Sequence, residues 1–279
     1  MVIEPQSGIG IRAMIHIRQG DCVDEVRKLD AESAHLVVCS PPYDDLRTYG
    51  QDETPDWNFF ALAGELFRVM VPGGVVCWNV GDAISKGGGE TLMSMRQAIH
   101  FVDVAGFRMH DTMIWHKLNF SSPSFTRYHQ CFEYVFVLSK GKPRCFNPIK
   151  DKRNATAGQV GNLGVNTFAN VDGTRSERKK HITAELGMRH NVWSGPTRGQ
   201  EDMCCEMPHP AMMPKWLVRD LIRSWSNPGD TVLDPLCGSG TVPIQALEVG
   251  RSAIAIDRNP DYIALVHKGI AEITPQIFT

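Results

Sequence analysis

Short apolar runs alternate with amphipathic stretches along most of the chain. The runs at 36–39, 75–82, 231–234 and 252–257 have the apolar, partly β-branched character of strands buried on both faces. Segments between them, such as 91–106 and 241–250, carry apolar residues at helical spacing and end at glycine. This alternation predicts a mostly parallel sheet covered by helices.

We expect seven strands in a doubly wound, Rossmann-like α/β sheet. The run at 14–21 precedes a short amphipathic stretch at 22–29, and further helical patterns lie at 56–74, 215–226 and 260–273. The runs at 107–117 and 133–141 complete the set of strands. They predict an antiparallel hairpin at one edge of the sheet.

The alternation stops between Lys140 and about Pro208. This stretch is rich in Gly, Asn and Thr and has few large apolar side chains, so it cannot supply much of a core. We expect an insertion at 141–205 that lies on the domain, between a first part at 1–140 and a second part at 206–279.

Charge is distributed unevenly between this stretch and the remainder of the chain. Residues 140–199 contain 12 Lys or Arg against 4 Asp or Glu, whereas the other residues contain 17 against 27. A basic segment in an acidic protein suits a polyanionic partner. A solvated loop would show the same composition.

The totals favour an intracellular globular protein. The 279 residues are 42% hydrophobic and 22% charged, and no apolar run approaches the roughly 20 residues of a membrane span. The first residues resemble no signal peptide. The eight cysteines include no CxxC pair, and the adjacent Cys204 and Cys205 are poorly placed to share a metal ion. We therefore expect reduced thiols and no metal site.

The segment LVVCSPPY at 36–43 ends a predicted strand in two prolines. Pro41 and Pro42 lack N–H donors and fix φ, so the carbonyl groups of the turn are held rigidly. Ser40 adds a hydroxyl group, and Tyr43 adds a flat aromatic face. The segment predicts a site with fixed acceptors beside a stacking surface. A structural turn with a half-buried tyrosine is the alternative.

The segment VLDPLCGSGT at 232–241 joins a strand, a glycine turn and a helix N-terminus. Gly238 and Gly240 let the backbone approach a ligand, and Asp257 ends the next strand where a carboxylate can bind ribose hydroxyls. The turn lacks the third glycine of a dinucleotide site and the lysine of a phosphate loop. Asp234 favours a cationic ligand instead. S-adenosylmethionine, with a sulfonium, an ammonium group and a ribose, fits both carboxylates.

Three motifs together resemble those of the S-adenosylmethionine-dependent DNA methyltransferases that modify exocyclic amino groups. They are CSPPY at 39–43, HPAMMP at 209–214 and LDPLCGSGT at 233–241. The catalytic motif precedes the cofactor motif, an order similar to the β group of this family, in which the target recognition domain lies between them. The resemblance covers the chain outside roughly 141–205. It implies a catalytic part at 1–140, a target recognition region at 141–205 and a cofactor-binding part at 206–279.

The resemblance also implies which residues bind the cofactor. HPAMMP would lie against its methionine moiety, and QGD at 19–21 near its adenine. Family members often carry Glu at the position of Asp257, a mild departure from the pattern. The implied cofactor-binding residues are Asp21, His209, Pro210, Pro214, Asp234, Pro235, Cys237, Gly238, Ser239, Gly240, Thr241 and Asp257.

An exocyclic amino group is a poor nucleophile because its lone pair is delocalised into the ring. Acceptors facing its two N–H bonds favour a pyramidal nitrogen and stabilise the developing charge. We assign these roles to Ser40 Oγ and the Pro41 carbonyl, held rigid by Pro42. Tyr43 would stack on a base rotated out of the duplex, and the transfer would be direct and in line.

Serine at the first position of SPPY resembles the N4-cytosine members, whereas adenine members more often carry Asp or Asn there. We therefore expect methylation of N4 of cytosine, with N6 of adenine as the alternative. Two other classes stay open. One is a non-catalytic protein that binds the cofactor and DNA, and the other is a methyltransferase of RNA or protein.

The basic stretch supplies candidate phosphate contacts. These residues are Lys150, Lys152, Arg153, Arg175, Arg178, Lys179, Lys180, Arg189 and Arg198. The expected partners are duplex DNA and a cognate restriction endonuclease, with the protein acting as a monomer or homodimer. The expected location is the cytoplasm of a bacterial or phage-infected cell.

Overall fold

The computed structural model describes residues 2–3, 13–42, 57–84, 88–119, 127–159, 167–169, 171–177, 182–197 and 212–277. The chain forms two compact units, a body of Met1–Asn147 with Asn191–Thr279 and an inserted unit of Pro148–His190. The inserted unit is narrower than the stretch 141–205 expected from composition, because the residues on its two flanks belong to the body. Its role in target recognition stays a prediction.

One nine-stranded sheet forms the centre of the described body. In spatial order its strands are β1 (Val2–Ile3), β2 (Ala13–Gln19), β13 (Ser252–Asp257), β12 (Thr231–Asp234), β3 (Ala34–Cys39), β4 (Met70–Val80), β6 (Phe132–Ser139), β5 (Arg108–Lys117) and β11 (Val192–Gly195). β6 is antiparallel to β4 and β5, β1 is antiparallel to β2, and the remaining neighbours are parallel.

The predicted fold class is confirmed, and β5 and β6 form the predicted antiparallel pair. The pair does not form the edge of the sheet, because β11 lies outside β5. The sheet has two strands more than the seven expected. The additions are β1, with two residues, and β11, with four, and both are too short to give a periodic sequence signal.

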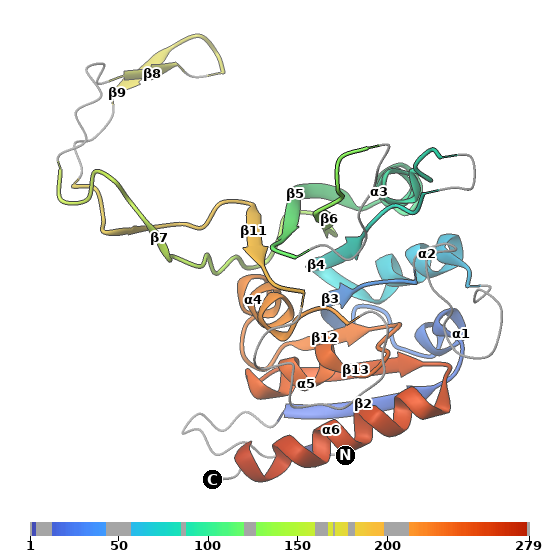
Figure 1. The fold of residues 1–279 in the computed structure, drawn as a ribbon. Coiled ribbons are helices and arrows are strands. Elements are labelled where there is room, and N and C mark those ends of the chain that lie inside the picture. The colour runs from blue at the N-terminus through green and yellow to red at the C-terminus, as the bar shows by residue number, and fades with distance from the viewer. Residues whose placement is uncertain are drawn as a thin grey trace. The chain divides into compact units, whose positions relative to one another are not determined.

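Helices cover both faces of the sheet (Figure 1). α1 (Cys22–Arg27), α2 (Phe59–Val69) and α3 (Met93–Asp103) pack in succession on one face. α4 (Lys215–Trp225), α5 (Thr241–Glu248) and α6 (Pro260–Ile277) pack in succession on the other. This two-sided covering explains why the central strands are apolar along their whole length.

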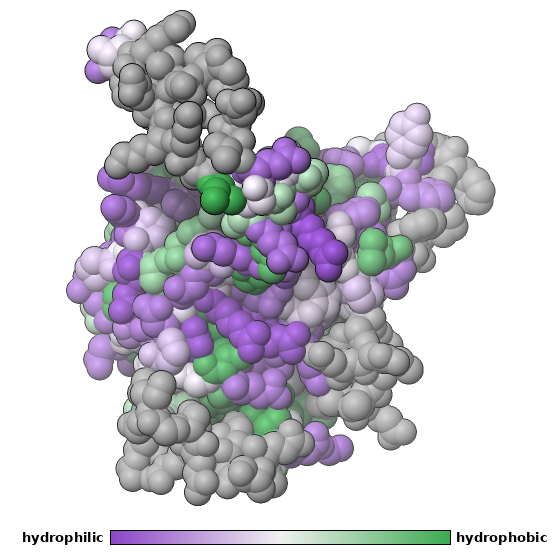
Figure 2. Space-filling model, turned by 90° about the vertical axis from the view of Figure 1, so that its left-hand side faces the viewer, coloured by the Kyte–Doolittle hydropathy of each residue, from purple (hydrophilic) through white to green (hydrophobic). Residues whose placement is uncertain are grey.

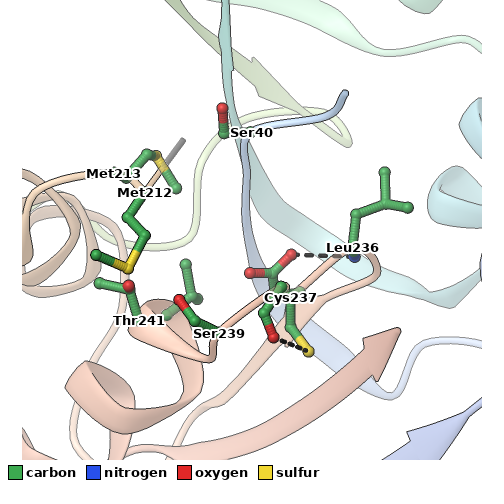
Figure 3. A pocket seen from close by; sticks show the side chains of 10 residues that line it. Ser40, Met212, Met213, Leu236, Cys237, Ser239 and Thr241 are labelled. Atoms are coloured by element: carbon green, nitrogen blue, oxygen red, sulfur yellow. Dashed lines mark hydrogen bonds between the residues drawn. The ribbon is translucent and has the colours of Figure 1, made fainter. Parts of the chain in front are cut away.

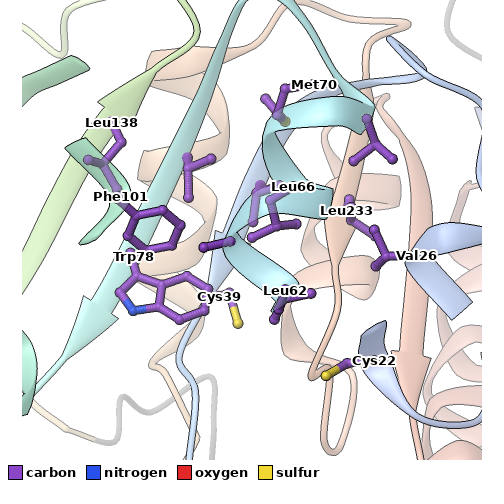
Figure 4. Packing of buried hydrophobic residues seen from close by; sticks show 14 of the residues in the cluster. Cys22, Val26, Cys39, Leu62, Leu66, Met70, Trp78, Phe101, Leu138 and Leu233 are labelled. Atoms are coloured by element: carbon purple, nitrogen blue, oxygen red, sulfur yellow. The ribbon is translucent and has the colours of Figure 1, made fainter. Parts of the chain in front are cut away.

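A buried apolar cluster lies between the sheet and the first three helices (Figure 4). Leu62 and Leu66 of α2 meet Trp78 of β4 and Phe101 of α3, and all four are fully buried. The rings of Trp78 and Phe101 meet edge to face with centroids 5.2 Å apart. Burial of such side chains stabilises the body by roughly 1.5–3 kcal/mol each.

Two adjacent phenylalanines of α2 differ in their burial. Phe59 is buried, whereas Phe60 is 66% exposed. Adjacent helical residues point about 100° apart, so a helix that buries Phe59 with Leu62 and Leu66 turns Phe60 toward solvent.

The inserted unit is held by short pairings. β7 (Lys152–Arg153) pairs antiparallel with β10 (Leu186–Gly187), and β8 (Thr167–Ala169) pairs antiparallel with β9 (Arg175–Glu177). Arg189 Nε donates to both carboxylate oxygens of Asp151, at 3.2 and 3.0 Å. No residue of this unit whose side chain is described is buried.

Hydrophilic residues predominate on the face drawn in Figure 2, and the hydrophobic ones form small groups. Among the described residues, no helix is both long enough and apolar enough to cross a bilayer. The same part of the chain contains no group of three His, Cys, Asp or Glu side chains that could hold a metal ion.

Candidate functional site

Four neighbouring parallel strands end at the same edge of the sheet. β2 leads into Asp21, β13 ends at Asp257, β12 ends at Asp234, and β3 leads into Ser40. The chain leaves β12 through α5 toward β13, and leaves β3 through α2 in the opposite direction toward β4. The crevice between β12 and β3 is therefore a topological switch point, where open α/β sheets bind their ligands.

The glycine turn after β12 folds back over the end of β13. Cys237 N–H donates to Ile256 O at 2.9 Å, and Gly238 N–H donates to Asp257 Oδ2 at 2.9 Å. Gly240 has a φ of 89°, and a Cβ there would lie 2.9 Å from Val266 Cγ2 of α6. Both the backbone angle and the close approach of α6 therefore require glycine at this position.

A pocket opens between this turn, the end of β3 and the segment before α4 (Figure 3). The empty space in it, counted together with open solvent at its mouth, is about 350 Å³. Figure 3 shows Ser40 on one side of it, Met212 and Met213 on another, and Ser239 and Thr241 at the turn. The lining residues are Ser40, Met212, Met213, Asp234, Leu236, Cys237, Gly238, Ser239, Thr241 and Val242.

Asp234 is the buried carboxyl group of the pocket, with an exposed fraction of 3%. Burial raises its pKa to about 7, although hydrogen bonds from Leu236 N–H and the Cys39 thiol favour the ionised form. A buried carboxylate of this kind is stabilised by a cation placed beside it. The arrangement suits a positively charged ligand and disfavours a phosphate.

Asp257 and Asp21 lie at the ends of the adjacent strands, and both accept backbone hydrogen bonds. Asp257 accepts from Gly238 and from Asn259, and burial raises its pKa. Asp21 is exposed and caps α1 by accepting from Val23 and Asp24. Asp21 Oδ1 accepts both of its bonds, and the two oxygens of Asp257 accept one bond each. Lone pairs therefore remain on both carboxylates for a hydrogen bond from a ribose or an adenine.

The helix that follows the turn begins at Thr241, directly beside the pocket. Gly240 occupies its N-cap position, and no side chain caps the first turn. The free N–H groups of Thr241 and Val242 are therefore available to a carboxylate of a ligand. Pro235 is buried behind the turn and is not among the residues that line the pocket.

The diproline turn lies across the crevice from the glycine turn. Leu233 pairs with Val37, so Asp234 is level with Val38 on the neighbouring strand. Ser40 follows Val38 by two residues. Ser40 is half-buried and lines the pocket, Pro41 is buried, and Pro42 is half-buried. Tyr43 lies outside the described residues. The structure thus brings the first residue of SPPY to the same pocket as Asp234.

Part of the segment HPAMMP also reaches this pocket. Met212 and Met213 line it, and Pro214 is the buried N-cap of α4. His209 and Pro210 lie outside the described residues. The two methionines, Leu236 and Val242 were not among the predicted site residues. Met212 and Met213 belong to HPAMMP, so the motif could have identified them as pocket residues. No sequence pattern distinguishes Leu236 and Val242.

The structure describes the side chains of only some of the residues predicted to contact phosphate. Lys150, Lys152 and Arg153 are exposed, and Lys152 Nζ lies 3.1 Å from His190 Nε2. Arg189 is paired with Asp151, which lowers the pKa of that carboxyl group and leaves Arg189 less available for phosphate. Arg175 lies on β9, its side chain undescribed. Arg178, Lys179, Lys180 and Arg198 lie outside the described residues.

A protein-family model described as a DNA methylase, N6_N4_Mtase, matches residues 34–268. Orphan methyltransferase M.BamHII of Bacillus amyloliquefaciens is 40% identical over 236 residues, which cover 84% of this chain and 87% of that protein. The DNA adenine methyltransferase YhdJ of Escherichia coli is 26% identical over 265 residues, which cover 91% of this chain and 81% of that protein.

Solved structures with the same fold include the cytosine-N4-specific PvuII DNA methyltransferase. It aligns with a TM-score of 0.65 at 19% identity and covers 95% of this chain and 93% of its own. The complex of M1.HpyAVI with S-adenosylmethionine aligns with a TM-score of 0.57 at 18% identity, covering 91% and 99%. At these identities the likeness establishes the fold.

Proposed function

Because the chain belongs to the DNA methylase family whose model matches residues 34–268, we propose that it methylates N4 of cytosine in duplex DNA. The proposed methyl donor is S-adenosylmethionine. The observation that carries the proposal is the meeting of two sequence motifs at one pocket, where Ser40 lies across the crevice from buried Asp234.

The pocket has the groups that such a donor needs. Asp234 provides a buried carboxylate for a cationic group, and Asp257 lies at the end of the neighbouring strand, within the reach of a ribose. Thr241 and Val242 offer free helix N–H groups to a carboxylate. When bound, S-adenosylmethionine would supply an electrophilic methyl group on a sulfonium.

The chain's own part in the chemistry is to hold the amino group. Ser40 Oγ and the Pro41 carbonyl would each accept one N–H bond of the base, which directs the nitrogen lone pair toward the methyl group. The φ angles of Pro41 and Pro42 are fixed by their rings, so these acceptors are oriented before the base arrives. The target base must leave the duplex to reach them.

Cytosine is proposed over adenine because serine opens the SPPY motif. The second candidate is N6 of adenine, which is supported by the 26% identity to a DNA adenine methyltransferase. A cognate endonuclease and a monomeric or homodimeric state also remain proposals. The family membership itself makes an RNA or protein substrate the weaker choice.

The test is transfer of a deuterated methyl group from labelled S-adenosylmethionine to genomic DNA that lacks methylation. Mass spectrometry of the nucleosides should show labelled N4-methyldeoxycytidine. Labelled N6-methyldeoxyadenosine in its place would establish the second candidate. DNA without label, treated with protein that binds the cofactor, would favour a non-catalytic binding protein.

A further inference from the structure

Both connections between the body and the inserted unit are attached to helix α4. The outgoing strand β6 is followed by Arg144–Asn147, and the chain returns from the inserted unit through Asn191 into β11. These flanking residues belong to the body. They contact opposite ends of α4, which with 11 residues is about 16 Å long.

The outgoing connection is attached to the C-terminal end of α4. Asn147 Nδ2 donates to the carbonyls of Arg223 and Ser226, at 3.1 and 3.0 Å, and its backbone N–H donates to Ser224 O at 2.8 Å. Phe146 stacks on Trp225 with ring centroids 4.7 Å apart. These bonds occupy carbonyl groups that a helix end leaves without partners.

The return connection is attached to the N-terminal end of α4 through Trp216. Its Nε1–H donates to Pro196 O at 3.2 Å. The backbone of Gly195 lies so close to the same indole ring that a Cβ at this position would be 2.3 Å from Trp216 Cζ2. Trp216 therefore makes both a polar and a packing contact with the return connection.

The return connection is itself fixed to the sheet. β11 pairs with β5, with Gly195 opposite Lys117. Thr197 exchanges hydrogen bonds with Asn119, its N–H donating to Asn119 Oδ1 at 3.1 Å. Trp216 thus joins the first turn of α4 to a rigid part of the body, and this turn directly follows the two methionines that line the pocket.

We propose that Trp216 is a positioning residue for the cofactor pocket. It fixes the first turn of α4, whose N-cap carbonyl at Pro214 accepts from Leu217 and Val218, and it thereby holds Met212 and Met213 against the ligand. This inference rests on the proposed function. It adds that cofactor affinity depends on the return connection from the inserted unit.

The experiment compares Trp216→Ala with Phe146→Ala in the full-length protein. Each variant removes one aromatic contact between α4 and a connection of the inserted unit, but at opposite ends of the helix. Binding of S-adenosylmethionine is measured by calorimetry without DNA, and thermal unfolding is measured in parallel. Steady-state kinetics with DNA separate the KM for the cofactor from kcat.

Trp216→Ala should weaken cofactor binding by about tenfold and raise the cofactor KM more than it lowers kcat. Trp216→Phe, which retains a ring against Gly195, should recover most of the affinity. Phe146→Ala should lower thermal stability to a similar extent and leave the cofactor affinity unchanged, because its contact at Trp225 is about 13 Å along the helix from Trp216.

Equal loss of cofactor affinity in Trp216→Ala and Phe146→Ala would overturn the inference, since it would reflect general loosening of α4. Unchanged affinity in Trp216→Ala would overturn it directly. Failure of the proposed function is distinguishable, because it appears in the unaltered protein as absent methyl transfer to cytosine, whereas the inference is tested by cofactor affinity measured without DNA. Should Trp216→Ala fail to fold, Gly195→Ala tests the same contact, and its expected result is the same loss of affinity.

Discussion

The body and the inserted unit differ in how their conformations are maintained. In the body, side chains such as Leu66 and Phe101 are fully buried between sheet and helices. In the inserted unit, none of the described side chains is buried, and the described contacts include two short strand pairs and the ion pair of Arg189 with Asp151. The body is therefore stabilised mainly by apolar burial, and the described part of the inserted unit mainly by polar contacts.

This difference is consistent with separate functions, with the pocket in the body and the predicted DNA contacts in the inserted unit. The pocket needs groups held in place to a fraction of an ångström, and the strand ends of a packed sheet provide such positions. A surface that binds the DNA backbone needs charge more than rigidity. The comparison therefore predicts that stability and chemistry respond to changes in the body, while DNA affinity responds to changes in the inserted unit.

The largest expected effect is on stability. Leu66→Ala should lower the free energy of unfolding by roughly 2–5 kcal/mol, because Leu66 is fully buried and its loss leaves a cavity. Leu186→Ala in the inserted unit is the matched control, since Leu186 is 41% exposed, and should change it by about 0.5 kcal/mol at most. Denaturant unfolding measures both, and similar losses would contradict the comparison.

The second effect is on catalysis. Ser40→Ala should lower kcat by about a hundredfold, as expected for removal of one acceptor that acts in the transition state. Affinity for S-adenosylmethionine and for duplex DNA should change little. Single-turnover methyl transfer and separate binding measurements check this result. A kcat within threefold of the unaltered protein would remove Ser40 from the reaction.

The third effect is on DNA binding. Replacement of Arg178, Lys179 and Lys180 by Ala should weaken binding by roughly 10- to 100-fold and flatten its salt dependence by up to about 2.7 in log–log slope. Cofactor affinity should not change. These residues lie outside the described part of the chain, so the prediction rests on charge. Titrations of labelled duplex DNA at several salt concentrations test it, and an unchanged slope would exclude this segment from the interface.

The motifs at the carboxyl edge could be predicted from sequence because each combines a periodic strand with residues that only certain turns require. Asp234 and the glycines after it, and Ser40 with the prolines after it, follow apolar runs that a packed sheet buries. The pairing of β12 with β3 then brings the two turns together. That pairing joins strands from opposite ends of the sequence, and the structure is needed to establish it.

The limits of the inserted unit could not be predicted, because they depend on tertiary contacts of polar residues. Composition assigned the flanks at 141–147 and 191–205 to the insertion, whereas the part of them that the structure describes belongs to the body. The sequence around Asn147 gives no sign that this residue packs on the body. Its hydrogen bonds to the carbonyls of Arg223 and Ser226 show that it does. Strand β11 could not be predicted either, because its four residues are too few to show a periodic pattern.

The smallest expected effect concerns pH, and it tests whether the buried carboxyl group of the body binds the cation. Burial raises the pKa of Asp234 from 3.8 to about 7. The folded protein without ligand therefore holds this proton more tightly than the unfolded chain, so Asp234 lowers stability progressively as pH rises from about 4 through 7. A cationic ligand requires the ionised form, so cofactor affinity should rise severalfold between pH 6 and pH 8.

Calorimetry across this pH range measures the effect, with Asp234→Asn as the control. The substitution keeps the size of the side chain and removes its titration, so the remaining pH dependence should be small. Asp257, whose pKa burial also raises, titrates in the same direction in both proteins and cancels in the comparison. If Asp234→Asn binds the cofactor with unchanged affinity and pH dependence, the cation lies elsewhere, and the pocket beside β12 loses its assigned ligand.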